Sequence, residues 1–375
     1  MKKTLLYVTS QDWVFISNRL PMARAARDAG FDVHVATAVQ DKGDAIRAEG
    51  FTLHPLPFRR GLSPMAMAAT IVALRRIEQS LSPSVVHNVG LQLCVAGGLS
   101  AIGTHTRQIN AMTGLGYAFT GISLRARMLR FVISIVLRFL LNRDNSVTLV
   151  QNPDDRAVLE SIGIDPQRIK LIAGSGVDTD VLQPLPEPRG TVTVGFAGRL
   201  LTEKGIRALV AAHRILRGRG ADVDLLIAGD PDPANPASVT TAEAQKWNDE
   251  PGIKWLGHLA DITELWKRSH IAALPSHREG LPKALLEASA CGRPLIAADA
   301  PGSREIAIDR KTGLLVPIED PQALANAIET LIHSKKLRET YGKAARQLVV
   351  DKMSSRSVGA AIVALYKGEL DARAQ

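Results

Sequence analysis

The sequence predicts an α/β protein built from two doubly wound, parallel-sheet domains in tandem. Short apolar runs rich in β-branched residues alternate with stretches of helical periodicity along the chain, a pattern typical of parallel sheets covered by helices on both faces. The alternation breaks at 174–190, where the proline-rich stretch 183–188 predicts a stiff linker. With 375 residues, 46% of them apolar, the chain is long enough for two hydrophobic cores.

Each predicted strand is a short run of valine, isoleucine, leucine or threonine bounded by glycine, proline or polar residues. In chain order the strands are 4–9, 33–36, 52–56, 85–87, 108–112, 147–151 and 169–172, then 192–197, 223–228, 253–256, 271–275, 294–298 and 313–316. The helices between them repeat apolar residues at three and four positions, and several begin at a proline. The clearest helices are 20–29, 64–81, 206–217, 282–290 and 321–333.

These elements define a first domain at 1–176, a linker at 177–190 and a second domain at 191–354. A last helix is predicted at 355–374, in the terminal segment 355–375, and the pattern leaves open which domain it packs on. Ligands of doubly wound sheets bind beyond the carboxyl ends of the strands. We therefore expect the site in a cleft where the two Rossmann-like domains face each other.

Composition excludes several protein classes. Two cysteines, Cys94 and Cys291, are too few for a disulfide scaffold or a four-cysteine zinc site. The apolar stretch at the N-terminus meets Gln11 and Asp12 too early for a secretory signal, which predicts a cytoplasmic protein. The aromatic content of 4% disfavours single-strand binding by base stacking, so we expect no nucleic-acid partner.

Positive charge is concentrated in one window. Residues 51–143 carry ten arginines and a single acid, Glu78, a surplus as large as the net charge of +9 of the whole chain. A basic surface of this kind attracts phosphate groups, whether of lipids, substrates or nucleic acids.

The densest polar pattern follows the predicted strand 271–275. Glu279 and Gly280 fall in a loop, Pro282 suits the first helical position, and Gly292 ends the helix. Such a loop turns backbone N–H groups and the positive end of the helix dipole toward a ligand, which favours an anion site.

The carboxylates Glu279 and Glu287 are eight residues apart, a helical rise of about 12 Å. Glycosidase carboxylates stand roughly 5–9.5 Å apart, so this spacing disfavours a hydrolase, although a loop can bring Glu279 closer. It suits two carboxylates that bind hydroxyl groups at different points of one long ligand. The alternative is a surface helix with a solvated Glu287 and with Glu279 as an N-terminal acid that the helix dipole favours.

A second pattern follows the predicted strand 192–197. Gly198 lets the backbone approach a ligand, and Gly205 permits a turn before the next helix. Arg199 and Lys204 stand at the same edge of the sheet as the acidic loop. Two cations beside a helix N-terminus can hold a diphosphate without a metal; the alternative is a basic capping loop without a ligand.

Together these motifs resemble the family 4 retaining glycosyltransferases of the GT-B fold. The resemblance is densest over 192–320 and covers essentially the whole chain. Its further motifs are Gly174-Ser-Gly176-Val-Asp178, Ala228-Gly229-Asp230, Leu256-Gly257-His258, Pro301-Gly302-Ser-Arg-Glu305 and Gly313-Leu-Leu-Val316.

The resemblance implies roles for the matched residues. Arg199 and Lys204 would bind the donor diphosphate, Glu279 the transferred sugar and Glu287 the ribose; the first three are the expected catalytic residues. The full set expected at the donor is Gly198, Arg199, Lys204, Leu256, His258, Leu259, Glu279, Gly280, Leu281, Pro282 and Glu287. Cations and N–H groups would stabilise the charge that develops on the leaving oxygen, and retention with proton transfer to the leaving phosphate would need no protein nucleophile.

Three Asp-x-Asp pairs, at 178–180, 222–224 and 230–232, have the form of the metal motif of the other common glycosyltransferase fold. They lie at a strand entry or in turns rich in glycine or proline. We therefore expect no metal and no cofactor, with the nucleotide sugar as substrate.

The first domain is expected to select the acceptor. Its opening segment, and the stretch 110–117, resemble bacterial polysaccharide-assembly members, many of which extend undecaprenyl-diphosphate-linked sugars. Such enzymes often have histidine where this chain has Asn18, and near the positions of Asn110 and Thr113, which leaves catalysis there open. His87, at the end of its predicted strand, is a further candidate; a structural histidine is the alternative.

The segment 122–143 is apolar but contains five arginines. Its longest apolar run, 131–137, is far too short to span a bilayer. An interfacial helix with arginines on lipid phosphates fits this pattern, so we expect a peripheral protein on the anionic inner face of the cell membrane. The alternative is a core helix with an exposed basic edge.

The sequence thus predicts transfer of a hexose or N-acetylhexosamine from a nucleotide-diphosphate sugar, with UDP as the expected nucleotide, to a lipid-linked saccharide in bacterial surface polysaccharide or glycan assembly. A non-hydrolysing nucleotide-sugar epimerase has the same two-domain plan and is the enzymatic alternative. A two-lobed sugar-binding protein is the alternative of another class, and it should carry an export signal. A nicotinamide dehydrogenase would need Gly-x-Gly-x-x-Gly after a first strand, which 4–17 and 192–205 lack.

Overall fold

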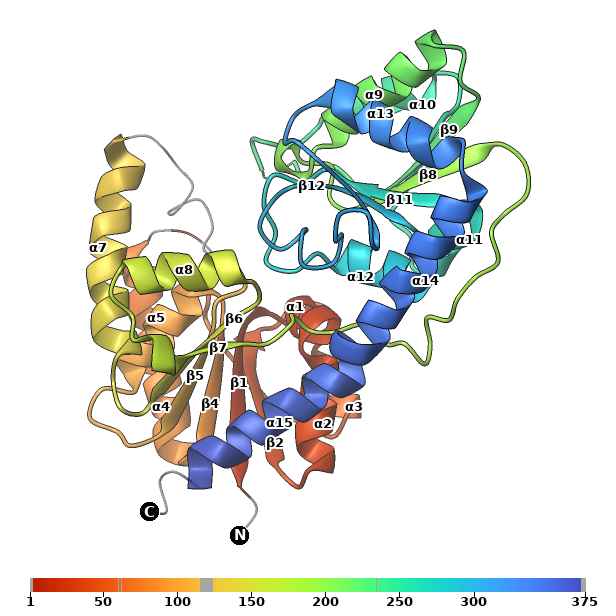
Figure 1. Cartoon of the computed structure of the whole chain (residues 1–375). Coiled ribbons are helices and arrows are strands. Elements are labelled where there is room, and N and C mark those ends of the chain that lie inside the picture. The colour runs from red at the N-terminus through yellow and green to blue at the C-terminus, as the bar shows by residue number, and fades with distance from the viewer. Residues whose placement is uncertain (1–2, 60, 62, 115–123, 234, 372–375) are drawn as a thin grey trace. The chain divides into compact units, whose positions relative to one another are not determined.

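The structure is a computed structural model that describes residues 3–59, 61, 63–114, 124–233 and 235–371, with the backbone alone at 124–126. The chain forms two compact units. Unit 1 comprises Met1–Ser175 and Ser355–Gln375, and unit 2 comprises Gly176–Ser354. Each unit contains one parallel sheet with helices on both faces (Figure 1), which confirms the predicted fold class of two tandem parallel-sheet α/β domains.

The sheet of unit 1 has the strand order β3-β2-β1-β4-β5-β6-β7, with all neighbours parallel. Its strands are β1 (Thr4–Gln11), β2 (Asp32–Ala38), β3 (Thr52–Pro55), β4 (Val85–Val89), β5 (Arg107–Ala111), β6 (Ser146–Val150) and β7 (Ile169–Leu171). Its helices are α1 (Asp12–Asn18), α2 (Leu20–Asp28), α3 (Gly43–Ala48), α4 (Pro64–Leu81), α5 (Leu91–Ser100), α7 (Leu124–Leu141), α8 (Pro153–Ser161), the 3₁₀ turn η1 (Pro166–Arg168) and α15 (Ser355–Asp371).

Alternate residues of β1 enter two separate cores, because successive side chains of a strand point to opposite faces of its sheet. Leu5 and Tyr7 pack with α1, α2 and α15 on one face. Leu6 and Val8 pack with α4 and α5 on the other. All four side chains are fully buried, so β1 is a central strand, as its continuous apolar run predicts.

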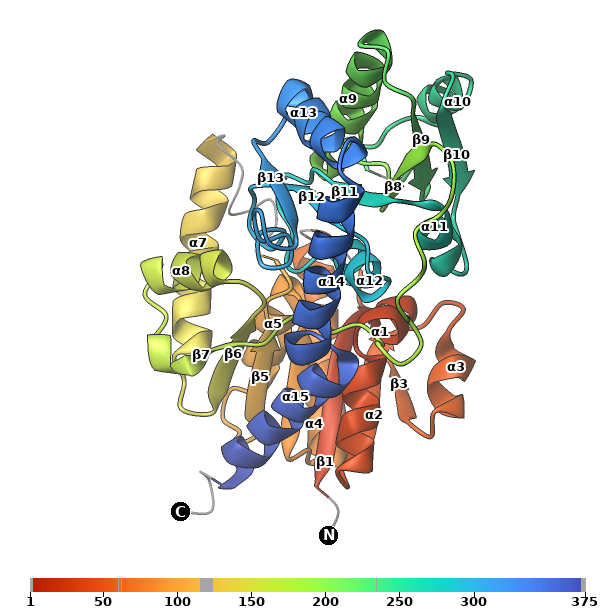
Figure 2. The same ribbon diagram turned by 45° about the vertical axis from the view of Figure 1, so that its right-hand side comes forward.

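Helix α15 belongs to unit 1 and lies along α2 (Figures 1 and 2). Its Val358 and Ile362 enter the same core as β1, and its Tyr366 hydroxyl lies 2.8 Å from the Tyr7 hydroxyl. The chain therefore returns from unit 2 to complete unit 1, which answers the question that the sequence pattern left open. Residues 372–374 of the predicted helix lie outside the described residues.

The sheet of unit 2 has the order β10-β9-β8-β11-β12-β13, again with parallel neighbours. Its strands are β8 (Val192–Ala197), β9 (Val223–Ala228), β10 (Ile253–Gly257), β11 (Ile271–Leu274), β12 (Leu295–Ala298) and β13 (Gly313–Val316). Its helices are the 3₁₀ turn η2 (Thr202–Lys204), α9 (Ile206–Gly218), α10 (Thr241–Asn248), α11 (Thr263–Arg268), α12 (Lys283–Ala290), α13 (Pro321–Ile332) and α14 (Lys335–Lys352). Helices α9 and α13 pack together above the sheet, and α11 and α12 lie below it in Figure 1.

The segment predicted as a linker, 177–190, is bonded to the rest of unit 2. The Leu185 amide donates to the Cys291 carbonyl at 3.1 Å, and the Arg293 guanidinium donates to the Pro186 carbonyl at 2.8 Å. Glu187 accepts two hydrogen bonds from Arg338, at 2.8 and 3.0 Å. These contacts hold the proline-rich stretch on the surface of unit 2.

Every predicted strand is present in the described part of the chain, with boundaries shifted by at most two residues. Two shifts matter for the site. Pro282 precedes α12 as its N-cap, with an extended ψ of 115°, and is not the first helical residue as predicted. Strand β4 continues to Val89, so His87 lies at its centre and not at its end. Among the described helices, none has both the length and the apolarity needed to cross a bilayer.

Glu78 is a buried acid of α4 that is hydrogen-bonded to the last residue of α5. The residue is 4% exposed, and its Oε1 accepts a hydrogen bond of 2.7 Å from the Ser100 hydroxyl. Its Oε2 has no partner in the described structure. Burial raises the pKa of this carboxyl to about 7, against the smaller opposing effects of Ser100 and Arg75.

A Glu78→Gln variant is expected to be more stable than the wild type at pH 8 and nearly equal to it at pH 5. Because the folded-state pKa lies above the unfolded value of 4.5, the wild type loses stability as pH rises from about 4.5 to about 7, and the neutral amide avoids that loss. We expect a gain on the order of 1–3 kcal/mol at pH 8, measured by urea unfolding across pH. The control is Glu160→Gln, at a half-buried glutamate paired with Arg156, and equal pH profiles for the wild type and Glu78→Gln would contradict this account.

Candidate functional site

The predicted donor residues of unit 2 lie where the strand order changes direction. Strands β8 and β11 are neighbours at the centre of the sheet, although β9 and β10 separate them in sequence. Arg199 and Lys204 follow β8, and Glu279 follows β11. The carboxyl ends of two such strands form the ligand-binding crevice of doubly wound sheets.

Gly205 fastens the two loops together. Its φ is +72°, and a Cβ at this position would lie 2.0 Å from the carbonyl oxygen of Pro275, at the end of β11. Two hydrogen bonds to the carbonyl of Glu203 reinforce the contact, from the His277 amide at 2.9 Å and from the Ser276 hydroxyl at 3.0 Å. Glycine is required here both for its left-handed conformation and for the close backbone approach.

Lys204 and Glu279 form an ion pair across this junction. The distance from Lys204 Nζ to Glu279 Oε1 is 2.5 Å, and the two side chains are 21% and 11% exposed. The backbone of Glu279 is held as well, because its amide donates to the Pro301 carbonyl at 3.0 Å. Gly302, with a φ of +80°, packs directly on the Glu279 and Gly280 carbonyls. A charged pair is thus fixed in position by three loops.

Arg199 lies at the outer part of the same edge. Its side chain is 55% exposed and donates to Asp232 Oδ2 at 3.0 Å. The backbone below it is tightly packed, since a Cβ on Gly229 would lie 1.9 Å from the Gly198 carbonyl oxygen. The carboxylate of Asp232, part of one Asp-x-Asp pair, therefore has an arginine as its partner.

Glu287 lies one turn into α12. Its side chain is 13% exposed, and Lys283 Nζ lies 3.5 Å from its Oε1. Burial raises the pKa of this carboxyl, and Lys283 opposes the rise. A carboxylate in such a place can accept hydrogen bonds from the hydroxyls of a bound polyol.

The remaining predicted donor residues lie at the same edge of the sheet. Leu256 and Leu259 are half-buried and His258 is exposed, at the end of β10 and just beyond it. Gly280 and Leu281 are half-buried and Pro282 is buried, between β11 and α12. With the strand order β10-β9-β8-β11, the residues near β10 and those near β11 bracket Arg199.

The predicted acceptor residues of unit 1 are not gathered in one place. Asn18 donates to the Val14 carbonyl at 3.3 Å and to the Ser17 hydroxyl at 2.8 Å, at the end of α1. Thr113 is exposed, and residues 115–117 of its motif lie outside the described residues.

His87 and Asn110 are both inside unit 1. His87 is fully buried, and its Nδ1 lies 2.5 Å from the Tyr366 hydroxyl. Asn110 is buried between its neighbouring strands, where it accepts from Asn88 at 3.1 Å and donates to Ser146 Oγ at 2.9 Å. The bonds of Asn110 link β4, β5 and β6.

The sequence analysis missed a cavity at the carboxyl ends of β1, β2 and β3. Its volume is about 340 Å³, and it is lined by Ser10, Gln11, Ala38, Gln40, Phe58 and Arg59. Asp12 shapes its rim, because this buried carboxylate accepts the Gln40 and Lys42 amides at 2.7 and 2.9 Å. The signal in the sequence was the polar triplet Ser10-Gln11-Asp12 at the end of β1, which served above to exclude a signal peptide and as part of the family resemblance. Within the described residues, no group of three or more histidine, cysteine, aspartate and glutamate residues could hold a metal.

Comparison with known protein families covers most of the chain. The family of glycosyl transferases group 1 matches residues 178–348, which contain every predicted donor residue. The glycosyl transferase 4-like domain family matches residues 19–174. The boundary between the two matches falls at the boundary between the two units.

Individual relatives share low sequence identity over nearly their full length. The capsular polysaccharide biosynthesis glycosyltransferase CapM of Staphylococcus aureus is 22% identical, over 94% of this chain and 95% of its own length. The N,N'-diacetylbacillosaminyl-diphospho-undecaprenol alpha-1,3-N-acetylgalactosaminyltransferase of Campylobacter jejuni is 23% identical, over 88% of this chain and 89% of its own. Among solved structures, Anabaena Alr3699/HepE in complex with UDP superposes with a TM-score of 0.80 at 18% identity, over 98% of this chain and 100% of its own.

A Gly205→Ala variant is expected to destabilise unit 2 strongly, because the added methyl would clash with the Pro275 carbonyl and the residue would keep a positive φ. We expect a loss of at least about 2 kcal/mol, seen as a lower midpoint of thermal unfolding. Gly218→Ala is the control at the other end of α9, where a Cβ meets no atom within 4 Å. Equal midpoints for the two variants would show that the Gly205 contact does not hold the loops.

Proposed function

Because this chain belongs to the family 4 glycosyltransferases of the GT-B fold, we propose that it moves a hexose or N-acetylhexosamine from a UDP-sugar to a lipid-linked saccharide of the undecaprenyl-diphosphate type. The product would be an intermediate in bacterial surface polysaccharide or glycan assembly. Two names support the choice of acceptor, since CapM acts in capsular polysaccharide biosynthesis and the Campylobacter relative uses an undecaprenol diphosphate acceptor. The UDP complex of Anabaena HepE supports the choice of nucleotide. Family membership favours this reaction over the epimerase and the sugar-binding protein.

The observation that carries the donor assignment is the joined pair of loops after β8 and β11. Lys204 is fixed at this junction, with Arg199 beside it on the same strand end. Cleavage of a sugar–diphosphate bond leaves negative charge on the departing oxygen. Positioned cations stabilise that charge most in the transition state, and they do so without reorganising. Arg199 and Lys204 would supply this charge without a metal.

The two glutamates would bind hydroxyl groups of the donor. Glu279, beside Lys204, would contact the transferred sugar, and Glu287, one turn into α12, would contact the ribose. The raised pKa of Glu287 suits a group that exchanges hydrogen bonds with neutral hydroxyls, because a fully solvated carboxylate would have to lose more water on binding.

We propose transfer with retention of configuration and without a protein nucleophile. The acceptor hydroxyl oxygen would bond to the anomeric carbon on the face from which the diphosphate departs. The carbon–oxygen bond to the diphosphate breaks, its electron pair stays on the phosphate oxygen, and the acceptor proton moves to that phosphate. The protein's part is to hold the leaving group and the sugar in place.

Replacement of either cation is expected to reduce turnover. Arg199→Ala or Lys204→Ala should lower kcat by roughly 10²–10³, the range for removing one donor to an oxyanion, and Glu279→Gln should impair transfer while the fold is retained. The measurement is sugar transfer to a polyprenyl-diphosphate-linked acceptor with UDP-, GDP- and ADP-sugars.

The matched control is Arg217→Ala, which removes an exposed arginine of α9 that is paired with Asp222. It should leave turnover unchanged. Near-wild-type rates in both cation variants would remove the diphosphate assignment, whereas release of an altered sugar nucleotide without any acceptor would favour the epimerase.

We also propose that α7 binds the anionic inner face of the cell membrane. Five of the fourteen large apolar residues exposed in the described structure lie on this helix: Met128, Phe131, Val132, Ile135 and Phe139. They recur at intervals of three and four residues, which places them on one stripe. The opposite side, with Leu137 and Leu141, is buried in unit 1.

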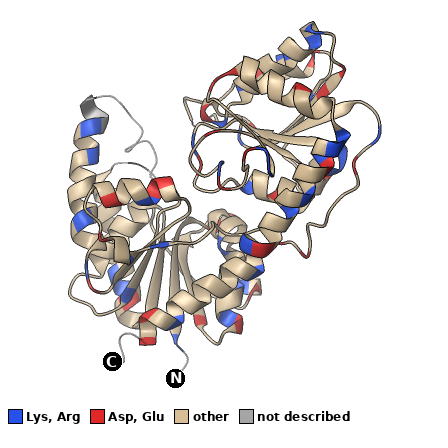
Figure 3. Cartoon of the chain, viewed as in Figure 1, with Lys and Arg blue, Asp and Glu red and all other residues tan. Residues whose placement is uncertain are grey.

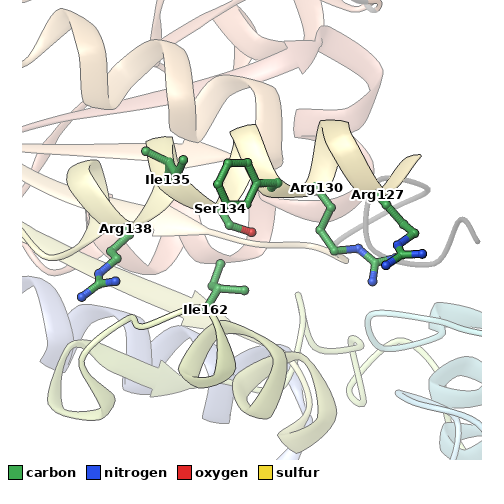
Figure 4. Close-up of a pocket in the computed structure, with 7 residues that line it drawn as sticks. Arg127, Arg130, Ser134, Ile135, Arg138 and Ile162 are labelled. Carbon is green, nitrogen blue, oxygen red and sulfur yellow. The ribbon is translucent and has the colours of Figure 1, made fainter. Parts of the chain in front are cut away.

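Arginines flank the exposed stripe. Arg127, Arg130 and Arg138 line a surface groove of about 410 Å³ along α7, together with Phe131, Ser134, Ile135 and Ile162. Figure 4 shows all three guanidinium groups extending to the same side of the helix as Ile162. Figure 3 shows basic and no acidic positions on α7. Exposed apolar side chains beside arginines are typical of a helix that lies in a lipid interface. Residues 122 and 123 of the predicted segment lie outside the described residues.

Charge reversal on α7 is expected to weaken binding to lipid vesicles. The double variant Arg127→Glu/Arg130→Glu should reduce binding to vesicles of phosphatidylglycerol and phosphatidylcholine by about tenfold or more at low salt, since each basic residue near such a surface contributes about 1 kcal/mol. Flotation at low and high salt measures this, with Arg214→Glu/Arg217→Glu on α9 as the control. Failure of the wild type to float at low salt would end the membrane proposal.

A further inference from the structure

Arg19, between α1 and α2, is a buried cation that has no carboxylate partner among the described residues. It is 2% exposed, and its guanidinium makes two weak contacts with described residues, from Nη1 to the Asn18 carbonyl at 3.3 Å and to Met22 Sδ at 3.8 Å. Its Nε is buried and has no hydrogen-bond partner among the described residues. A guanidinium stays charged in proteins, and burial without a counterion costs several kcal/mol. A cost of this size suggests that the buried guanidinium binds an anionic ligand.

His87 contributes a second unpaired nitrogen. Its Nδ1 lies 2.5 Å from the Tyr366 hydroxyl, which lies 2.8 Å from the Tyr7 hydroxyl. If Tyr7 donates to Tyr366 and Tyr366 donates to Nδ1, every hydroxyl proton of this chain of bonds has an acceptor. The neutral ring then carries its proton on Nε2, and this nitrogen is buried without a partner in the described structure. Burial lowers the pKa of His87 well below its usual value, and the charge of Arg19 lowers it further, so the ring is neutral.

Arg19 and His87 line the same cavity. It has a volume of about 10 Å³, the room needed for one water-sized group. Gln151 and Ile172, both half-buried, also line it, and they follow β6 and β7. The cavity therefore lies toward the carboxyl ends of the strands, the edge at which doubly wound sheets bind ligands.

From these contacts we infer that the cavity is an oxyanion subsite of unit 1, in which one oxygen of a phosphate group accepts hydrogen bonds from Arg19 Nε and His87 Nε2. Both groups are N–H donors, and no carboxylate of the described structure neutralises the cation, so an anionic oxygen matches the site better than a neutral hydroxyl. The phosphate is either free in solution or carried by the acceptor; the second source rests on the lipid-linked acceptor proposed above.

The first test is binding of inorganic phosphate, read as thermal stabilisation. In an Arg199→Ala background, which removes one phosphate contact from unit 2, phosphate should raise the unfolding midpoint by about 2–4 °C over chloride of equal ionic strength once it exceeds its Kd about tenfold. The additional change Arg19→Met should abolish this rise. Without phosphate, Arg19→Met should be as stable as its parent or more stable, because replacing a buried unpaired charge by an apolar chain of similar length removes a cost.

Arg24→Met is the matched control, since Arg24 lies on α2, the helix that Arg19 precedes, but is 48% exposed and paired with Glu49. It should keep the full phosphate response. An equal response in Arg19→Met and its parent, or no response above that to chloride, would overturn the inference, and the cavity would then be a site for water. If Arg19→Met fails to fold, His87→Phe gives a second test, because it removes the Nε2 donor and should weaken the response.

The second test separates the two sources of phosphate. Steady-state transfer to a short-chain polyprenyl-diphosphate-linked N-acetylglucosamine is compared for the wild type and Arg19→Met. A KM for this acceptor raised about tenfold or more, with kcat changed less than about threefold, assigns the phosphate to the acceptor. An unchanged KM with a lost phosphate response assigns the site to free phosphate. Absence of transfer by the wild type would count against the proposed acceptor and leave the result of the phosphate test standing.

Discussion

The close contact between Gly205 and the Pro275 carbonyl sets the geometry of the proposed donor site. Strands β8 and β11 are adjacent in the sheet but more than seventy residues apart in the chain, so their loops meet only because the sheet order reverses between them. A side chain at position 205 would separate the loops by the width of a methyl group. The ion pair of Lys204 and Glu279 spans the two loops that this backbone contact joins.

Much of this site could be predicted from the sequence, because its residues lie at the ends of strands and the starts of helices. Periodicity located β8 and β11, and the rule that ligands bind at the carboxyl ends of strands then placed Arg199, Lys204 and Glu279 at one edge. The partners of these side chains could not be predicted. The pairing of Arg199 with Asp232 depends on the path of a loop, and the sequence analysis considered Asp232 only as part of a metal motif.

In unit 1 the fold was predictable and the site was not. The strands were located to within two residues, but the interactions of His87 depend on Tyr366, which lies 279 residues away in the chain. No local pattern indicates which domain receives a C-terminal helix, so the contact of His87 with Tyr366 could not be foreseen, although a structural histidine was one of the two interpretations. Arg19 was missed for the same reason: its burial results from the packing of α1, α2 and the sheet, whereas arginine in a sequence is normally read as a surface residue.

The cations of the two units differ in their surroundings: those of unit 2 are paired and partly exposed, and Arg19 of unit 1 is buried. In unit 2, Arg199 and Lys204 already contact carboxylates and are partly exposed to water, so a diphosphate would exchange one anionic partner for another at little cost in desolvation. In unit 1, the cost of burying Arg19 was met when the domain folded. An oxyanion that enters there would add an interaction instead of replacing one. A single hydrogen-bonded oxygen would then be enough for binding, although the buried cation exerts little long-range attraction. The site of Arg199 and Lys204 suits a diphosphate that must also leave as product. The Arg19 cavity suits a phosphate that stays bound while another part of the same ligand reacts.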